Sequence, residues 1–336
     1  MRTAQDAPGR VPTGLDSPAA GPSLAGHLRI LRVDHWFKNV FVIPGIVLAW
    51  FFHGSELDAG ALVWRIPLGF LSVSLVASSN YVINEVLDAP FDRLHPTKHR
   101  RPVPSGLVNT RLAYVQWIVV GVAGLALAVP LGLRFFLCAA WLLAMGVLYN
   151  VPPLRLKDVV FLDVLVESVN NPIRLLVGWY LAAPDAHLPP LSLILSYWMI
   201  GCYFMALKRF AEYRGIDDAK VAATYRRSFA RYTDDLLLVT VMGYGSAAML
   251  FLGAFAVRYR PELLLSFPLI ALVMAIYLRI GLRDESPVQA PERLYREPLL
   301  VAACVLCAAM LVFLVAVDLG WLTDAIDPDF PTTIDG

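Results

Sequence analysis

Residues 66–106 read IPLGFLSVSLVASSNYVINEVLDAPFDRLHPTKHRRPVPSG, an apolar run that passes directly into acidic and then basic side chains. The apolar window at 66–87 is long enough to cross about 30 Å of hydrocarbon as a helix. Near its end, Asn84, Asp88 and Asp92 are four residues apart, so on a helix, or on its last turn, their side chains lie along one stripe. We therefore predict a membrane helix that carries an acidic stripe at its C-terminal end.

The acidic stripe offers oxygen ligands that suit a divalent metal ion. Mg²⁺ prefers such hard ligands, and it normally keeps several waters and bridges to the phosphates of a substrate. Cationic side chains follow directly and could bind the rest of a diphosphate. They are Arg93, His95, Lys98, His99, Arg100 and Arg101. The local chemistry indicates a site for Mg²⁺ and phosphate.

Composition places the chain among polytopic membrane proteins. Of its 336 residues, 58% are hydrophobic and only 16% are charged, which is too apolar for a soluble domain of this size. Apolar windows long enough to cross a bilayer predict an all-α membrane protein with nine transmembrane helices in one domain. The windows lie at 36–53, 66–87, 112–132, 135–150, 159–182, 190–212, 234–257, 262–281 and 298–319.

The distribution of Lys and Arg predicts the orientation of the chain. Most of the 28 Lys and Arg residues fall at the N-terminal end or in loops on that same side. The opposite loops hold Arg65, Arg134, Arg258 and Arg260. Under the positive-inside rule, the N-terminus and the long loops at about 88–111 and 213–233 face the cytoplasm, in an inner (plasma) membrane of bacterial type. Anionic head groups would attract the same basic loops, and a net charge of +1 gives no indication of nucleic acid binding.

The two ends of the chain differ from its apolar middle. Residues 1–26 lack the apolar stretch of a cleavable signal peptide, and their composition predicts a disordered tail. Residues 27–319 are expected to form a single transmembrane catalytic domain. Residues 320–336 form an acidic C-terminal tail, which nine spans would place outside the cytoplasm.

The predicted fifth span, 159–182, is unusually polar for a membrane segment. Its polar side chains step by three or four residues and so share one helix face. They are Asp163, Glu167, Asn170, Asn171 and Arg174. Ionisable groups in a membrane cost about 2.5–3.5 kcal/mol each on insertion scales, so they usually face a cavity or a partner. An ion pair between Glu167 and Arg174 is an alternative, although this stripe holds more polar groups than one ion pair needs.

The sixth span ends in MALKRFAEYRG (205–215), which gathers charge on its last turn. Cations there gain from the helix dipole, so Lys208 and Arg209 could serve as a topological anchor. Glu212 lies one turn after Lys208 and could form a simple helix ion pair with it. Phosphate binding is the competing hypothesis, and the local pattern favours neither.

Several runs of the sequence recur together in one known family. They are LRVDHWFKNVFVIP (31–44), SSNYVINEVLDAPFDRLHPTKHRRPVPSG (78–106), LYNVPPLRLKDVVFLDVL (148–165), and ALKRFAEYRG (206–215) with RRSFARYTDDLL (226–237). In this order and spacing the chain resembles the UbiA superfamily of intramembrane prenyltransferases from about residue 28 to 318. Within that superfamily it is most similar to the polyprenyl-phosphate phosphoribosyltransferase branch.

The resemblance implies a nine-helix bundle with a polar, cytoplasm-facing cavity and a lateral opening for an isoprenoid lipid. The family's acidic motif falls on Asn84, Glu85, Asp88 and Asp92, which implies that these four bind the metal ion. Glu85 stands where the family has Asp, so the longer side chain could shift the metal or leave Glu85 unused. A second polar site falls on Lys157, Asp158, Asp163 and Glu167, and a third element on Lys208, Arg209 and Glu212. Asn170, Asn171 and Pro172 depart from the branch, where small apolar residues tend to occur.

The resemblance also implies an enzyme, a Mg²⁺-dependent intramembrane transferase. The preferred hypothesis is transfer of a phosphoribosyl group from 5-phosphoribosyl diphosphate to a polyprenyl phosphate, with release of diphosphate. The alternative is transfer of a prenyl group from its diphosphate to an aromatic or other small acceptor. Across protein classes, the rival is a transporter or structural membrane protein, in which polar stripes mark a permeation path. Metal and phosphate ligands concentrated at one end argue against that rival.

These hypotheses assign roles to individual side chains. The residues expected to act in catalysis are Asp88, Asp92, Asp163 and Glu167. The residues expected to bind substrate are Lys38, Asn84, Lys98, Arg101, Lys157, Asn170, Arg174, Lys208, Arg209 and Glu212. The expected partners are an isoprenoid lipid, a donor that carries a diphosphate and the lipid bilayer, and the oligomeric state is left open.

Overall fold

The computed structural model describes residues 21–54, 57–93, 98–216, 222 and 226–326. Every regular element among these residues is helical, which confirms the predicted all-α class. The α-helices are α1 (Leu24–Arg29), α2 (Ile43–His53), α3 (Ala59–Asp92), α4 (Thr110–Ala128), α5 (Leu133–Asn150), α6 (Leu162–Ser168), α7 (Asn170–Ala182), α8 (Leu191–Arg214), α10 (Asp234–Tyr259), α11 (Phe267–Gly281), α12 (Pro298–Ala316) and α13 (Gly320–Ile326).

Short 3₁₀ segments join or extend these helices. They are η1 (Val33–Val42), η3 (Lys98–Arg100), η4 (Val129–Leu131), η5 (Leu156–Asp158), η6 (Arg227–Ala230), η7 (Pro261–Ser266), η8 (Pro287–Gln289) and η9 (Pro291–Arg296). The predicted tail at 1–26 and the predicted acidic tail at 320–336 lie largely outside the described residues, as does His95. Within the first of these tails, α1 begins at Leu24.

Among the described residues, eight helical segments are long and apolar enough to cross a membrane, so the predicted count of nine is not confirmed. They are Leu24–His53, Ala59–Asp92, Thr110–Leu131, Leu133–Asn150, Leu191–Arg214, Asp234–Tyr259, Pro261–Gly281 and Pro298–Ala316. The difference is the predicted fifth span, 159–182, which is divided between α6 and α7.

The break in the fifth span lies next to a proline. Pro172 has no backbone N–H to donate to the carbonyl of Ser168, and its ring would crowd that carbonyl in a continuous helix. The side-chain amide of Asn170 donates a hydrogen bond of 3.0 Å to the carbonyl of Glu167, which offers the backbone a local alternative to the helical ladder. The polar stripe predicted on one helix face is therefore shared by two short helices.

Helix α3 keeps the acidic motif helical to its last member. It runs for 34 residues, and the side chain of Asp58 caps its first turn by accepting a hydrogen bond of 3.1 Å from the N–H of Ala61. At 1.5 Å per residue the helix is about 50 Å long, more than a bilayer core needs. Asn84, Asp88 and Asp92 therefore share one face near its C-terminal end, as the four-residue spacing predicts.

The most extensive helix contacts join α8 to α10, α3 to α4, and α2 to α7. The contact between α2 and α7 is made by backbone. A Cβ atom added at Gly45 would lie 2.0 Å from the carbonyl oxygen of Leu175, and one added at Gly178 would lie 2.0 Å from that of Val42. Two glycines thus let these helices approach more closely than any side chain permits.

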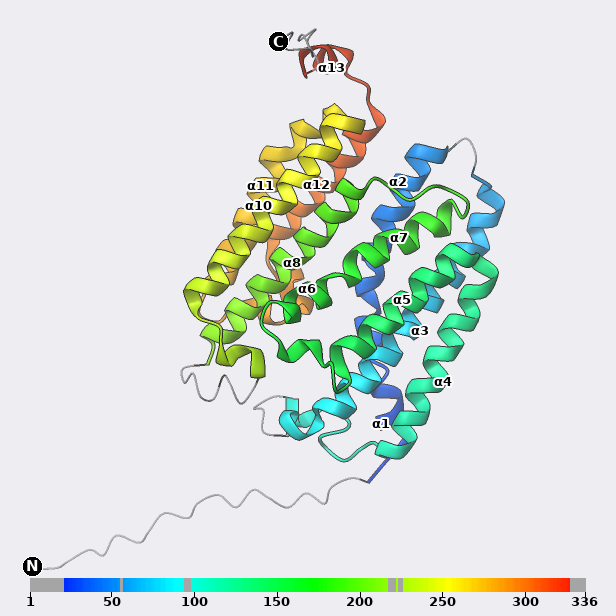
Figure 1. Cartoon of the computed structure of the whole chain (residues 1–336), viewed down its shortest axis with the longest axis vertical. Helices are drawn as coiled ribbons and strands as arrows, with labels where there is room; N and C mark the ends of the chain where they lie inside the picture. Colours follow the sequence, from blue (N-terminus) through cyan, green and yellow to red (C-terminus); the bar gives the residue numbers. More distant parts are fainter. Residues whose placement is uncertain (1–20, 55–56, 94–97, 217–221, 223–225, 327–336) are drawn as a thin grey trace, which may run out of the picture.

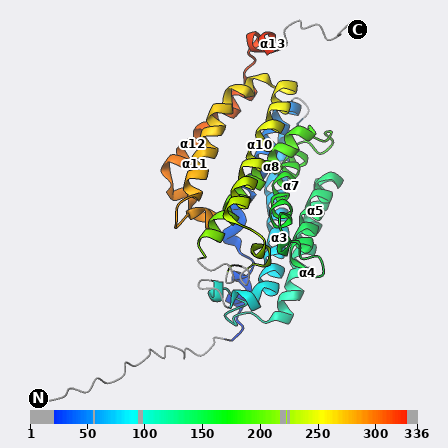
Figure 2. The ribbon, with the colours of Figure 1, turned by 60° about the vertical axis from the view of Figure 1, so that its left-hand side comes forward.

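The helices form two packed groups that share one end of the molecule. One core joins α2, α3, α5 and α7, and another joins α8, α10 and α11. Figure 1 shows α6 between these groups, and Figure 2 shows α11 and α12 along the outer edge of α10. The C-terminal ends of α3, α5 and α8 and the N-terminal end of α10 meet at one end, away from α13 (Figure 1).

At the opposite end, arginine side chains bind backbone carbonyls at the ends of helices. Arg65 donates hydrogen bonds of 3.0 Å to the carbonyl of Leu181 and 2.9 Å to that of Leu131. Arg260 donates one of 3.1 Å to the carbonyl of Val317, just after α12. These contacts satisfy C-terminal carbonyls that helices leave unpaired. At that end Arg65 ties α3 to α7 and to the segment after α4, and Arg260 separately ties η7 to α12.

Candidate active site

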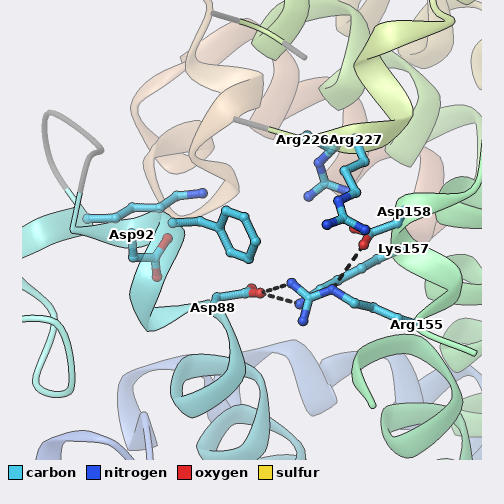
Figure 3. Close-up of a pocket in the computed structure, with 9 residues that line it drawn as sticks. Asp88, Asp92, Arg155, Lys157, Asp158, Arg226 and Arg227 are labelled. Carbon is cyan, nitrogen blue, oxygen red and sulfur yellow. Dashed lines mark hydrogen bonds and ion pairs between the residues drawn. The ribbon is translucent and has the colours of Figure 1, made fainter. Parts of the chain in front are cut away.

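A charged pocket lies where the ends of α3, α5 and α8 meet (Figure 3). Four separate segments line it: the end of α3, the 3₁₀ turn η3, the loop around η5, and the residues at the start of η6. Its lining residues are Asp88, Phe91, Asp92, Lys98, Arg155, Lys157, Asp158, Arg226 and Arg227. Five cations face three carboxylates, so the lining carries a formal charge of 5 − 3 = +2. Such a pocket favours an anionic ligand.

Asp88 is the most heavily paired carboxylate of the pocket. Its Oδ1 atom lies 2.9 Å from Nη2 of Arg155 and 2.5 Å from Nζ of Lys157. Arg155 also reaches Asp158, with Nε 3.0 Å from Oδ2, so one guanidinium bridges two carboxylates (Figure 3). Lys157 donates a further hydrogen bond of 3.0 Å to Oδ1 of Asn150. The network joins α3 to α5 and to the loop that follows α5.

The other motif residues on α3 have different partners. Asp92 pairs with Arg101, whose Nη1 lies 2.6 Å from Oδ2 of the carboxylate. The amide of Asn84 donates a hydrogen bond of 2.5 Å to Oδ1 of Asn150. Glu85 does not line the pocket, because it is 2% exposed and its Oε1 accepts a hydrogen bond of 3.0 Å from the N–H of Val103. One residue along a helix is about 100° around it, so Glu85 leaves the stripe and anchors the following loop.

The pocket suits a metal ion that is shared with a substrate. Among residues the structure describes, no group of three or more His, Cys, Asp and Glu side chains is arranged to hold a metal. Mg²⁺, however, usually binds one or two carboxylates together with phosphate oxygens and waters. Asp88 and Asp92 supply two carboxylates to one pocket, beside cations that can bind the same phosphates. The donor set therefore fits Mg²⁺ bound with a phosphorylated ligand.

Two lysines of the pocket have perturbed acidity. Burial lowers the pKa of Lys98 to about 8, and the same cause lowers the pKa of Lys157 to about 8 against the opposing effect of Asp88. A phosphate bound beside these ammonium groups would oppose the shift, because a nearby negative charge favours the protonated amine.

A second charged cluster lies behind the pocket, at the end of α8. Arg209 pairs with Glu212 across 2.6 Å, and Nζ of Lys208 lies 4.0 Å from the same carboxylate. Asp163 is completely buried, and its Oδ2 lies 3.5 Å from Nε of Arg209. The helix ion pair expected as the simpler alternative for Lys208 and Glu212 is therefore present, and these residues do not line the pocket.

A third polar group lies deeper, between η1 and α7. Arg174 donates hydrogen bonds of 3.3 Å to Oδ1 of Asn39 and 3.3 Å to the carbonyl of Asn170. The ammonium of Lys38 lies 5.8 Å from the centre of the Tyr81 ring. In the described part of the chain no ion pair joins Glu167 to Arg174, so the stripe is not explained by that pair. None of these side chains lines the pocket.

The pocket therefore gathers only some of the predicted site residues. Asp88, Asp92, Lys98 and Lys157 line it, Arg101 binds the lining residue Asp92, and Asn84 binds Asn150, which is not part of the lining. Sequence reasoning missed Phe91, Arg155, Arg226 and Arg227. Arg226 and Arg227 open the run RRSFARYTDDLL, and Arg155 immediately precedes Leu156 and Lys157 of the loop motif. All three arginines thus lie in recognised motifs, but the sequence offers no spatial reason to assign them to the pocket.

Comparison with known proteins identifies the fold and the family. Residues 40–296 match the UbiA prenyltransferase family. A decaprenyl-phosphate phosphoribosyltransferase of Mycolicibacterium smegmatis is 30% identical over 66% of this chain and 67% of its own length. A protein of the same name from Mycobacterium tuberculosis is 32% identical over 64% of this chain and 68% of its own length.

A solved structure supports the same assignment at the level of fold. A UbiA homolog from Archaeoglobus fulgidus, bound to DMAPP and Mg²⁺, superposes with a TM-score of 0.64 at 19% identity, covering 87% of this chain and all of that one. The resemblance recognised in the sequence motifs is confirmed, as is the expectation of an enzyme embedded in a membrane. The chain is an integral membrane transferase and belongs to the UbiA prenyltransferase family.

Proposed function

We propose that the enzyme transfers a phosphoribosyl group from 5-phosphoribosyl diphosphate to a polyprenyl phosphate, with release of diphosphate, and that it requires Mg²⁺. The observation that carries this proposal is the excess of cations in the pocket, five against three carboxylates. A sugar donor brings a 5-phosphate as well as its diphosphate, so it needs more positive charge than a prenyl diphosphate does. The names of the mycobacterial relatives point to the same reaction.

The reaction needs charge stabilisation more than it needs a base. The bond from the anomeric carbon to the diphosphate breaks, and diphosphate leaves with the electron pair. An oxygen of the polyprenyl phosphate forms the new bond to that carbon. Because this oxygen belongs to an anion at neutral pH, no side chain has to remove a proton from it. The chain's task is to bind the donor and to neutralise the leaving group.

The pocket residues divide this task between them. Asp88 and Asp92 would hold Mg²⁺, which when bound supplies positive charge to the leaving diphosphate. Lys98, Arg155 and Lys157 would bind diphosphate oxygens. Arg155 and Lys157 pair with Asp88 in this structure, so binding of metal to Asp88 would free both cations for phosphate. Phe91 also lines the pocket, and its ring centre lies 5.4 Å from the guanidinium carbon of Arg155.

The membrane setting follows from the same proposal. The donor is a water-soluble metabolite, so the pocket has to face the compartment that contains it. We place the enzyme in a bacterial inner membrane with the pocket on the cytoplasmic side, because the basic loops surround that end. The acceptor is an isoprenoid lipid held by the bilayer and by the bundle.

A direct comparison of donors tests the proposal. Purified protein is given Mg²⁺, labelled 5-phosphoribosyl diphosphate and a polyprenyl phosphate, and in parallel a labelled prenyl diphosphate and an aromatic acceptor. We expect the ribose label to enter the lipid fraction and the prenyl label to stay in its donor. Transfer of the prenyl label alone would replace this function with the family's prenyl transfer to a small acceptor.

A further inference from the structure

Asp163 is buried away from the pocket lining, although a polar motif predicts it as part of the catalytic site. It is completely buried, and both of its carboxylate oxygens accept hydrogen bonds from one segment of chain. Tyr232 donates from its hydroxyl to Oδ1 at 2.7 Å, and Ser228 donates to Oδ2 at 3.1 Å. Both donors belong to the segment that contains η6, and both are buried, with Ser228 and Tyr232 at 0% and 3% exposed. The carboxylate therefore joins α6 to the start of α10.

The segment held by Asp163 is the one that brings two arginines to the pocket. Arg226 and Arg227 stand immediately before Ser228 and line the pocket opposite Asp88 (Figure 3). Arg226 also approaches the same carboxylate, with Nη1 3.8 Å from Oδ2 of Asp163. The segment thus has a buried, hydrogen-bonded side and a charged side that faces the ligand pocket.

The hydroxyl of Tyr232 extends the connection to the backbone of α6. It accepts a hydrogen bond of 2.8 Å from the N–H of Phe161 while it donates to Asp163. Phe161 has a positive φ of 66°, which costs energy for a residue with a side chain, so this turn depends on its partners. The Phe161 and Tyr232 rings also pack edge to face with centroids 6.0 Å apart. The turn that starts α6 and the η6 segment therefore stabilise each other.

We propose that Asp163 is a positioning residue, which fixes the η6 segment so that Arg226 and Arg227 bind the anionic donor, and that it is not a metal ligand. The proposal rests on the proposed function only in that the pocket binds a diphosphate group. The geometry of Asp163 supports this role. Its carboxylate is already bound by two hydroxyl donors and two guanidinium groups, so its acceptor sites are directed into the protein and not toward the pocket. Losing the connection would loosen the two arginines without altering Asp88 or Asp92.

The test removes single hydroxyl groups and compares each with a matched control. Tyr232→Phe and Ser228→Ala delete the two donors to Asp163. Tyr203→Phe and Ser196→Ala delete buried hydroxyls that bind backbone carbonyls elsewhere, at 2.6 Å to Met274 and 3.0 Å to Ala248. Trypsin cleavage after Arg226 or Arg227, mapped by mass spectrometry on purified protein, reports loosening of the segment. We expect cleavage about tenfold faster in the first pair, the factor for losing one buried bond to a charged group, and little change in the second.

Binding completes the test. Calorimetry with inorganic diphosphate and Mg²⁺ should show an affinity about tenfold weaker in Tyr232→Phe and Ser228→Ala than in their controls. Asp163→Asn should also speed trypsin cleavage but leave binding of Mn²⁺, followed by its paramagnetic resonance signal, as in wild type, whereas Asp88→Asn should weaken it. Weaker Mn²⁺ binding in Asp163→Asn with unchanged cleavage would make Asp163 a metal ligand and overturn the proposal.

The use of inorganic diphosphate and trypsin, in place of the sugar donor, separates this inference from the proposed function. Wild-type trypsin resistance and wild-type diphosphate affinity in both hydroxyl variants would overturn the positioning role whichever donor the enzyme uses. If the enzyme instead transfers prenyl groups, the trypsin comparison and the affinity for diphosphate still decide the role of Asp163, because neither depends on ribose.

Discussion

Asp88 has two cationic partners in this structure and a third expected partner in the metal ion. Its Oδ1 atom lies 2.9 Å from Arg155 and 2.5 Å from Lys157, so a Mg²⁺ ion bound at that oxygen would displace at least one of these cations. A displaced cation would then be available to bind phosphate. Binding of metal and of diphosphate should be mutually favourable, since each removes a charge that opposes the other.

Replacement of Asp88 or Asp92 tests the metal site. Asp88→Asn and Asp92→Asn should leave the fold intact but lower turnover at least about 100-fold, the scale for losing one preorganised electrostatic contact to a transition state. Removal of Mg²⁺ by a chelator should do the same, and the measurement is label transfer into lipid. Asp58→Asn, at the other end of α3, is the control, because Asn caps a helix as well as Asp does. Full activity after chelation, or in either variant, contradicts the assignment of Mg²⁺.

The acidity of Lys98 predicts how donor binding changes with pH. Burial lowers its pKa to about 8, Arg101 and Arg226 lower it further, and Glu212 and Asp92 raise it. The side chain is thus charged below pH 8 and neutral above it, so affinity for an anionic donor falls as pH rises. KM for the donor should increase between pH 7 and 9, by about tenfold if the full charge-assisted bond is lost. Lys98→Arg keeps its charge in this range and should flatten the rise, and an identical pH profile in that variant would contradict the prediction.

At the scale of elements, sequence reasoning succeeded where periodicity and hydropathy determine the structure. Asn84, Asp88 and Asp92 lie on one helix because the apolar run before them is long enough to form a membrane helix, and α3 runs to Asp92. The fifth span was predicted as one helix because a hydropathy window averages over a local break. Pro172, which supplies the break, was visible in the sequence, but its effect depends on which partners the freed carbonyl of Ser168 can find.

The close contact of α2 with α7 predicts the cost of adding a single methyl group. Gly45→Ala and Gly178→Ala would each place a Cβ atom 2.0 Å from a carbonyl oxygen of the other helix, so the helices must separate. We expect each change to destabilise the protein by about 3 kcal/mol or more and to lower its Tm in detergent by roughly 5 °C or more. Gly243→Ala in α10 is the control, since a Cβ there has no neighbour within 4 Å. Equal Tm values for all three variants would refute the backbone contact.

At the scale of the whole molecule, the pocket is lined by four segments that are separate in the sequence, and this limits which of its residues the sequence could predict. The acidic stripe is a local pattern, so Asp88 and Asp92 were found. Arg226 and Arg227 come from a segment more than a hundred residues away from α3, and their role depends on how η6 is held against α6. Glu85 shows the converse case, since a motif position was filled by an acid whose side chain points elsewhere. Charge composition alone cannot distinguish these cases.

The orientation of the bundle can be tested with an impermeant thiol reagent in intact cells. A cysteine at Arg93, an exposed position just after α3, should resist labelling, because we expect the pocket end to face the cytoplasm. A cysteine at Leu188, 59% exposed in the loop between α7 and α8, should be labelled. Labelling after cell lysis confirms that both positions are reactive. The reverse pattern in intact cells would invert the orientation and with it the cytosolic source of the donor.

The arginines that bind carbonyls at the end opposite the pocket restrict what the bundle can do with its product. Transporters expose a central site to each side in turn by rocking one half of the bundle against the other. Here Arg65 joins α3 to the carbonyls after α4 and near the end of α7, and Arg260 joins η7 to the end of α12, so each half of the bundle is fastened within itself at that end. Under the proposed function, release of the product lipid at that end would therefore require the two halves to separate as whole bodies, because no single one of these helices can swing away without losing its arginine bonds.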